Sequence, residues 1–256
     1  MSLLTIRPAR REDLPTLAEW LGRKASLPEA AHEHLWVAEM AAPEMSLRAA
    51  SRLLPALGLR VPRVSYHVGC TVHAAPELAL FQTQRTLLLG HDHTGASELA
   101  DITWAQADVP LSDQALALRA LVATAVQHIV HNRAHYATRL VAELPGPRDA
   151  AGQSPFWQGL GQHFYKGDPL AACATHGPDW RSHVAHLLPR HALYTSFLPA
   201  AAEAAIAQVH APARLLRELL EDAGLRYSFH VNVEDGGPIL EALVDDLPQV
   251  GRGAVA

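Results

Sequence analysis

A long amphipathic segment between two strand-like runs constrains the fold of this chain more than any other feature. Residues 112–137 have the spacing of a helix, with Ser112 as its cap. One side of this helix is apolar and carries Leu118, Leu121, Val122, Ala125, Val126 and Ile129. Residues 99–104 before it and 138–144 after it are typical of strands. Since a crossover helix joins parallel neighbours, we predict that these two strands run parallel.

Shorter patterns predict further strands and a helix around this unit. Residues 3–8 and 35–38 are expected to be strands, and Asp13 is expected to begin a helix. Residues 45–58 fit a strand or a helix by propensity. Residues 62–72 alternate in polarity, which predicts a strand with one buried face. That face carries Val64, Tyr66, Val68, Cys70 and Val72.

Composition excludes several classes of function. The 256 residues carry a net charge of −5, which offers no basic surface for nucleic acid or for an anionic membrane. Cys70 and Cys173 lie far apart in the sequence, which suits a reducing cytoplasm and predicts no disulfide framework. No apolar run resembles a signal peptide or a membrane span. We therefore expect a soluble, cytoplasmic protein.

Polar residues with catalytic chemistry gather in one loop. His91, Asp92 and His93 follow an apolar run, and short polar loops between buried runs often carry binding groups. The 16 histidines also raise the question of a metal. His128, His131 and His135 fall on one side of the predicted helix, but no Glu or Cys completes a known metal signature. We predict no metal site.

Several segments carry specific motifs. Residues 92–99, Asp-His-Thr-Gly-Ala-Ser-Glu-Leu, resemble the D-H-T-G-S-S-E-L segment of the arginine N-succinyltransferase family. Four further segments resemble that family in the same order along the chain. They are residues 66–74, 154–164, 189–198 and 208–213. Residues 233–241, with Asp-Gly-Gly-Pro, resemble a further family segment that is expected to join two strands through a glycine turn.

The resemblance implies an α/β fold of the acyl-CoA N-acyltransferase (GNAT-like) type, with a mixed sheet flanked by helices. Residues 1–145 would form the acyltransferase core, and residues 146–256 would form a family-specific half packed on it as one compact unit. The implied activity is transfer of a succinyl group from succinyl-CoA to the α-amine of arginine. The implied partners are these two small molecules, and the chain is expected to form a homo- or hetero-oligomer with a related chain.

The family also suggests which residues bind the acceptor and move the proton. His210 matches the histidine of the family's Q-V-H motif, which acts as proton donor, and an imidazole has a pKa suited to that task. Asp92 and His93 carry the loop motif and are expected to line the acceptor site. Glu98 can hold the planar guanidinium of arginine through two parallel hydrogen bonds. Asp101 and Asp235 are the alternatives for that role.

Succinyl-CoA is expected to lie along the strand that follows Glu98. Ile102 occupies the position where the family has a leucine credited with succinyl-CoA contact. Leu99 and Thr103 on the same predicted strand complete the expected contacts.

The loop that should hold the coenzyme's pyrophosphate departs from the acyltransferase pattern. Residues 105–112 contain no glycine, and Asp108 and Pro110 are unfavourable neighbours for a phosphate. The acceptor side after Pro28 is also shortened. The sequence therefore leaves two alternatives open: a non-catalytic partner subunit of a hetero-oligomeric succinyltransferase, or an acyltransferase for ornithine or another amine.

Overall fold

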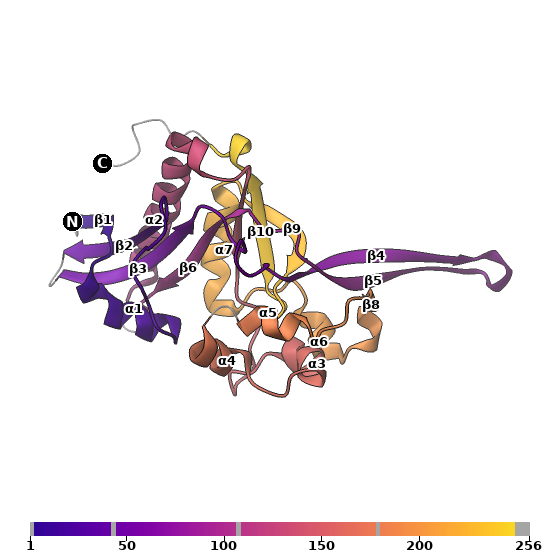
Figure 1. Cartoon of the computed structure of the whole chain (residues 1–256). Coiled ribbons are helices and arrows are strands. Elements are labelled where there is room, and N and C mark those ends of the chain that lie inside the picture. The colour runs from indigo at the N-terminus through magenta and orange to yellow at the C-terminus, as the bar shows by residue number, and fades with distance from the viewer. Residues whose placement is uncertain (1–2, 42–44, 106–108, 178–179, 249–256) are drawn as a thin grey trace.

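The fold is built on one mixed sheet of ten strands (Figure 1). The computed structural model describes residues 3–41, 45–105, 109–177 and 180–248. The strands lie in the order β1-β2-β3-β6-β7-β10-β9-β4-β5-β8. Their bounds are β1 Leu3–Pro8, β2 His34–Ala41, β3 Met45–Leu54, β4 Ser65–Ala75, β5 Leu80–Gly90, β6 Ser97–Trp104, β7 Arg139–Glu143, β8 Leu193–Tyr194, β9 Arg226–Val231 and β10 Pro238–Leu243. The expected mixed α/β class is confirmed.

Seven α-helices in the described ranges accompany the sheet. They are α1 Leu14–Leu21, α2 Leu111–His131, α3 Pro155–Gly159, α4 Pro169–His176, α5 Trp180–Ala185, α6 Ala200–Ala205 and α7 Arg214–Asp222. The largest apolar core lies between the middle of the sheet and helices α2 and α7. No helix in the described part is both long and apolar enough to cross a membrane.

Helix α2 connects β6 and β7, and these two strands run parallel as predicted. Every residue of the predicted apolar side of α2 is buried. The predicted ends of the helix are wrong. It begins at Leu111 with Pro110 as N-cap, and it ends at His131 because the Asn132 side chain donates to the carbonyl of His128. His135 therefore lies in a separate 3-10 turn and not on the helix.

Strands β6 and β7 separate soon after they begin. Their ladder consists of Ser97 opposite Leu140 and Glu98 opposite Val141. A shift of register on the β3 side of β6 accompanies this separation, and Asp101 at the bulge has φ +50°. From Leu99 onward, the edge of β6 that faces β7 has no strand partner among the described residues.

Residues 45–54, which propensity alone left open, form a strand. β3 pairs with β2 on one side and with β6 on the other. Ala49 and Leu53 are fully buried in the core. Position between two strands therefore decides the conformation of this segment, as is common where propensity is weak.

The carboxyl-terminal strands lie inside the sheet. The hairpin of β9 and β10 is inserted between β7 and β4, so both predicted halves of the chain build the same sheet. The turn between β9 and β10 is tight: a Cβ on Gly237 would lie 2.1 Å from the carbonyl oxygen of Leu144. The glycine turn was predicted correctly, and the division at residue 145 stays a prediction.

Strands β4 and β5 form a long hairpin that projects from the body of the molecule (Figure 1). They pair without interruption from Ser65 opposite Gly90 to Ala75 opposite Leu80. The predicted buried face is correct only at the base of this hairpin. Tyr66 is 1% exposed, whereas Val72 is 54% exposed because the body of the chain does not extend so far.

Candidate active site

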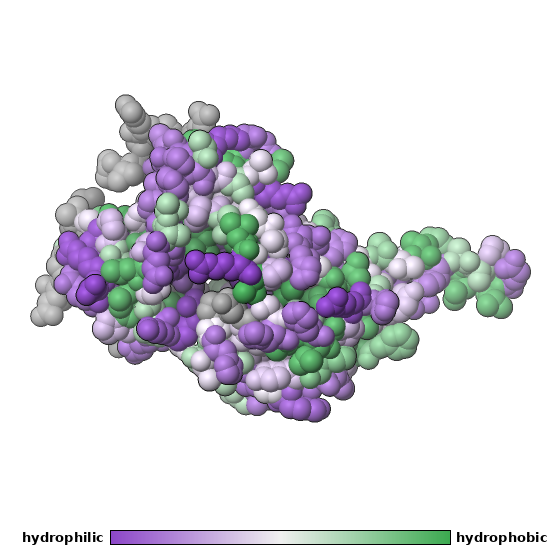
Figure 2. Space-filling view, viewed as in Figure 1, coloured by the Kyte–Doolittle hydropathy of each residue, from purple (hydrophilic) through white to green (hydrophobic). Residues whose placement is uncertain are grey.

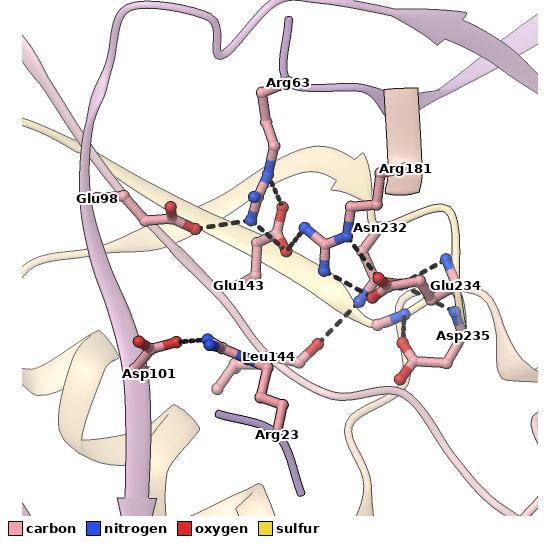
Figure 3. A network of polar contacts seen from close by, with 11 residues as sticks. Arg23, Arg63, Glu98, Asp101, Glu143, Leu144, Arg181, Asn232, Glu234 and Asp235 are labelled. Atoms are coloured by element: carbon pink, nitrogen blue, oxygen red, sulfur yellow. Dashed lines mark hydrogen bonds and ion pairs between the residues drawn. The ribbon is translucent and has the colours of Figure 1, made fainter. Parts of the chain in front are cut away.

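Glu98 lies at the start of β6, where β6 and β7 are still paired, and it is bound to an arginine of the chain itself. The Arg63 Nη2 donates to Oε1 of Glu98 at 2.8 Å (Figure 3). The same guanidinium donates through Nε to Oε1 of Glu143, at the end of β7, at 2.8 Å. Glu98 is only 4% exposed. Arg63 therefore joins the two neighbouring strands at the point where they separate.

A second arginine extends this network from α5. The Arg181 Nη1 donates to Oε2 of Glu143 at 3.1 Å, and its Nη2 donates to Oε2 of Glu234 at 2.6 Å. Figure 3 shows the two guanidinium groups on either side of the Glu143 carboxylate. Glu234 belongs to the turn between β9 and β10, whose backbone is held by the side chain of Asn232. Segments distant in sequence are thus fixed around one carboxylate.

The two carboxyl groups on β6 and β7 have opposite electrostatic environments. Burial raises the pKa of Glu98 above its usual value, although Arg63 opposes that shift. Burial acts on Glu143 in the same direction, but Arg63 and Arg181 outweigh it and lower the pKa of Glu143 to about 2. Glu143 is therefore a permanent anion, whereas the charge of Glu98 depends more on its neighbours. Perturbed carboxyl groups side by side in this way are typical of functional sites.

The polar loop after β5 places its motif residues against β9 and β10. Oδ2 of Asp92 lies 3.0 Å from Nε2 of His230. His93 is 2% exposed, and its ring packs edge-on against His230 at 4.5 Å between centroids. Nε2 of His93 is 3.3 Å from Glu241, but neither ring nitrogen has a hydrogen bond among the described residues. Burial and the charge of His230 lower the pKa of His93.

His210 lies beside the end of β7. Its backbone N–H donates to the carbonyl of Pro145 at 2.8 Å, and a 3-10 turn leads from it into α7. The side chain is half-buried. Because Pro145 follows Glu143 by two residues, both the predicted proton donor and the charged network meet the carboxyl end of β7.

A groove of about 540 Å³ lies next to this histidine, between the start of α2 and the start of α7. It is lined by Trp104, Leu111, Gln114, Ala211, Pro212, Arg214, Leu215 and Glu218. The Gln114 side chain donates to the carbonyls of Ala105 and Val109 and thereby holds both ends of the glycine-free loop. Asp108 itself lies outside the described residues.

The three residues expected to contact the coenzyme all lie on β6. Leu99 is 1% exposed and packs in the main core, so only its backbone is available to a ligand. Thr103 is buried opposite Ala50 of β3. Ile102 is half-buried against the same core. These contacts stay predictions, and they depend on the backbone of the strand.

The alternatives for guanidinium binding are already engaged. Asp101 accepts from Arg52 Nε at 2.9 Å and also pairs with Arg23 (Figure 3). Asp235 is buried and pairs with Arg148 at 3.3 Å. In the described ranges, no group of three or more His, Cys, Asp or Glu side chains could hold a metal ion.

Sequence reasoning missed the residues that complete the charged network. Arg63 and Arg181 lie in segments with no motif, and their ion pairs span 80 and 38 residues to Glu143. Glu143 did carry a weak signal, because it is a charged residue that directly follows the apolar run of residues 140–142.

Comparison with known proteins supports one class. The family model described as arginine N-succinyltransferase beta subunit matches residues 26–249. Arginine N-succinyltransferase of Yersinia enterocolitica is 31% identical over 279 aligned positions, which cover 97% of this chain and 78% of that protein. The protein of the same name from Enterobacter sp. strain 638 is 36% identical over 190 positions, covering 74% and 54%.

A solved structure has the same fold. Subunit AI of arginine/ornithine succinyltransferase from Pseudomonas aeruginosa superposes with a TM-score of 0.75 at 24% identity, covering 96% of this chain and 78% of that one. The solved structure thus shows that the mixed sheet with separating parallel strands is a shared fold. The family model and the curated relatives place the chain among the acyltransferases. More particularly, the chain belongs to the arginine N-succinyltransferase family.

Proposed function

We propose that this protein transfers the succinyl group of succinyl-CoA to the α-amine of arginine, as the opening step of arginine breakdown in the cytoplasm. The family match over residues 26–249 carries the proposal. The separation of β6 and β7 beside His210 supports it, because an extended acyl donor needs an open strand edge.

The donor would lie against β6 between Leu99 and Trp104. Its amide groups would bond the strand edge that has no partner in the described part of the chain. Its phosphates would enter the groove at the start of α2, where Arg214 supplies a positive charge. Arg214 would replace, in part, the glycine loop that is absent from this chain. Glu218 in the same groove would have to point away from the phosphates.

The acceptor would bind over the network around Glu98. This network contains three carboxyl groups, Glu98, Glu143 and Glu234, and two guanidinium groups, Arg63 and Arg181. If every group is ionised, it carries one negative charge in excess, which a substrate guanidinium would neutralise. Arg63 occupies Oε1 of Glu98, so Oε2 would accept from the substrate. Asp92 and His93 would form the rim of this site.

In the transfer step, the free α-amine attacks the thioester carbonyl, and the carbon–sulfur bond breaks. His210 would give a proton to the departing thiolate, and the proton released by the amine would restore the balance. The position of His210 at the end of β7 puts it next to the open edge along which the donor would lie. A proton donor held in place contributes about 10²–10⁴-fold to a rate.

The first test is calorimetric titration with succinyl-CoA and with desulfo-CoA, followed by turnover assays with arginine and, in parallel, ornithine. Micromolar binding and succinylarginine formation are expected. His210→Ala should lower kcat at least about 100-fold with an unchanged melting temperature, and the exposed His176→Ala serves as the control.

Three results would contradict the proposal. Lack of binding at millimolar succinyl-CoA would favour a non-catalytic partner subunit. Faster turnover of ornithine than of arginine would identify ornithine as the acceptor instead of arginine. A fully active His210→Ala variant would remove His210 from the mechanism.

A further inference from the structure

The apolar face of β4 continues beyond the core that should cover it. Along the projecting part of the hairpin, residues 68–85, one face carries Val68, Cys70, Val72 and Ala74 on β4 with Phe81, Thr83 and Arg85 on β5. The other face carries polar residues such as Thr71, His73, Gln82 and Gln84. A strand that alternates in this way is normally buried on its apolar face and solvated on the other. We call this face the apolar stripe. Val68 at its base still packs against a core, but the described residues leave the rest of the stripe exposed.

The stripe is exposed to an unusual degree. Val72 is 54% exposed, and Phe81 is 77% exposed. Figure 2 shows hydrophobic residues along the projecting hairpin. Residues 68–85 contain only two formally charged side chains, Glu77 and Arg85. Exposed strands usually carry charges that prevent association, and a hairpin standing alone in water is only marginally stable. These residues therefore need a partner that covers the stripe.

A groove of about 1160 Å³ lies at the base of the same hairpin. Its hairpin side includes Val68, Cys70 and Arg85, and the opposite side is formed by α6 and the residues that follow it, together with Tyr227 and Phe229. Phe229 is 62% exposed and has φ +59°, a conformation that bulky residues rarely adopt. Strained backbone is found preferentially where a ligand or partner binds.

We propose that the apolar stripe is a dimer interface, covered by the stripe of a second copy of this chain. Two such hairpins can stack antiparallel about a two-fold axis at the level of Val72 and Thr83. The two-fold axis makes the two hairpins point in opposite directions. A residue two positions from the axis toward the tip of one hairpin therefore faces the residue two positions from the axis toward the base of the other. Phe81 lies over the level of the partner's Cys70 and Arg85, and the tip enters the partner's groove.

This arrangement is self-complementary in charge. Arg85 is the only formally charged residue of the stripe, and it meets the partner's Phe81 rather than the partner's Arg85. A guanidinium over an aromatic face is favourable, whereas two facing guanidiniums would repel. The contact is isologous, as in most homodimers, so it closes without leaving a free stripe. A second copy thus accounts for the stripe and the groove together.

The decisive measurement is the molar mass of the purified full chain by sedimentation equilibrium, for the wild type and for two matched variants. Phe81→Asp places a negative charge on the stripe. Gln82→Asp changes the next residue and places the same charge on the opposite face of the hairpin. We expect a dimeric wild type, an unchanged Gln82→Asp, and a rise in the dimer Kd of at least roughly thirtyfold for Phe81→Asp, the effect of removing an interface hot spot. Circular dichroism melting confirms that both variants fold.

The register is tested by cross-linking. A bis-maleimide with a spacer of about 10 Å, the distance between stacked sheets, should link Phe81→Cys to the native thiol of the partner's Cys70, seen as a linked peptide pair by mass spectrometry. The double variant Phe81→Cys with Cys70→Ser should lose that linkage. A wild type that is monomeric at tens of micromolar, including one that associates only with a related chain, would overturn the proposal. So would a dimer that Phe81→Asp leaves intact, or an unchanged yield of cross-linked dimer when Cys70 is replaced.

Discussion

The two most informative strand pairs of this protein are opposites. β6 and β7 are deep in the sheet and separate after two residue pairs, whereas β4 and β5 stay paired along all eleven residues, well beyond the strands that flank their base. In the first pair, backbone groups are left open while side chains are packed. In the projecting part of the second pair, the backbone is satisfied while the side chains on its apolar face are exposed.

The difference shows two ways in which a sheet offers a binding surface. An open strand edge can bond the amides of an extended ligand, but it needs a rigid surrounding to stay open. Here the core under α2 and the ion pairs of Arg63 and Arg181 supply that rigidity. A complete ladder satisfies its own backbone groups, but a two-stranded hairpin is only marginally stable alone, and its exposed apolar face is suited to another protein.

The largest effect is expected from removing an arginine of the rigid region. Arg181→Met leaves the half-buried Glu234 without its ion pair and Glu143 with Arg63 as its remaining partner, which should lower the free energy of unfolding by about 3–5 kcal/mol. Arg217→Met is the control, because Arg217 pairs with Glu221 on the surface and such a pair contributes about 0.5 kcal/mol or less. Urea denaturation measures both. An equal loss of unfolding free energy in the two variants would show that the ion pairs of Arg181 do not stabilise the arrangement of β6 and β7.

A truncation in each strand pair compares their packing directly. Leu99→Ala on β6 should cost about 2–5 kcal/mol, since the side chain is fully buried and a cavity would remain. Val72→Ala on the hairpin should change the stability by no more than about 0.5 kcal/mol. Both are measured in the Phe81→Asp background, so that association does not contribute. A Val72 effect as large as that of Leu99 would mean that the stripe is covered within the monomer.

The smallest effect concerns recognition at the point where β6 and β7 separate. Glu98→Gln removes a charged acceptor for the guanidinium of arginine, which weakens binding by about 1.5 kcal/mol, or roughly tenfold. Steady-state kinetics should show that increase in the KM for arginine, with the KM for succinyl-CoA nearly unchanged. Equal increases in the KM values of the two substrates would indicate that Glu98 maintains the structure of the site and does not bind arginine directly.

Local spacing and motifs were sufficient to predict several features of this protein. The apolar side of α2 predicted the helix, its burial and the parallel strands that it connects, because periodicity along one segment reports which face is covered. The motif at residues 92–99 and its companions predicted the family. The roles of His210, Asp92, His93 and Glu98 stay predictions that the geometry makes testable.

Features that depend on contacts between distant segments became visible with the three-dimensional arrangement of the chain. Residues 45–54 are a strand because β2 and β6 lie on either side, and the occupation of Glu98 by Arg63 spans 35 residues. The alternation at residues 62–72 correctly predicted a buried face at Tyr66. It could not reveal that Val72 lies on the part of the hairpin that projects from the rest of the molecule. A sequence pattern states that a face is apolar, whereas the arrangement of the whole chain determines what, if anything, is available to cover it.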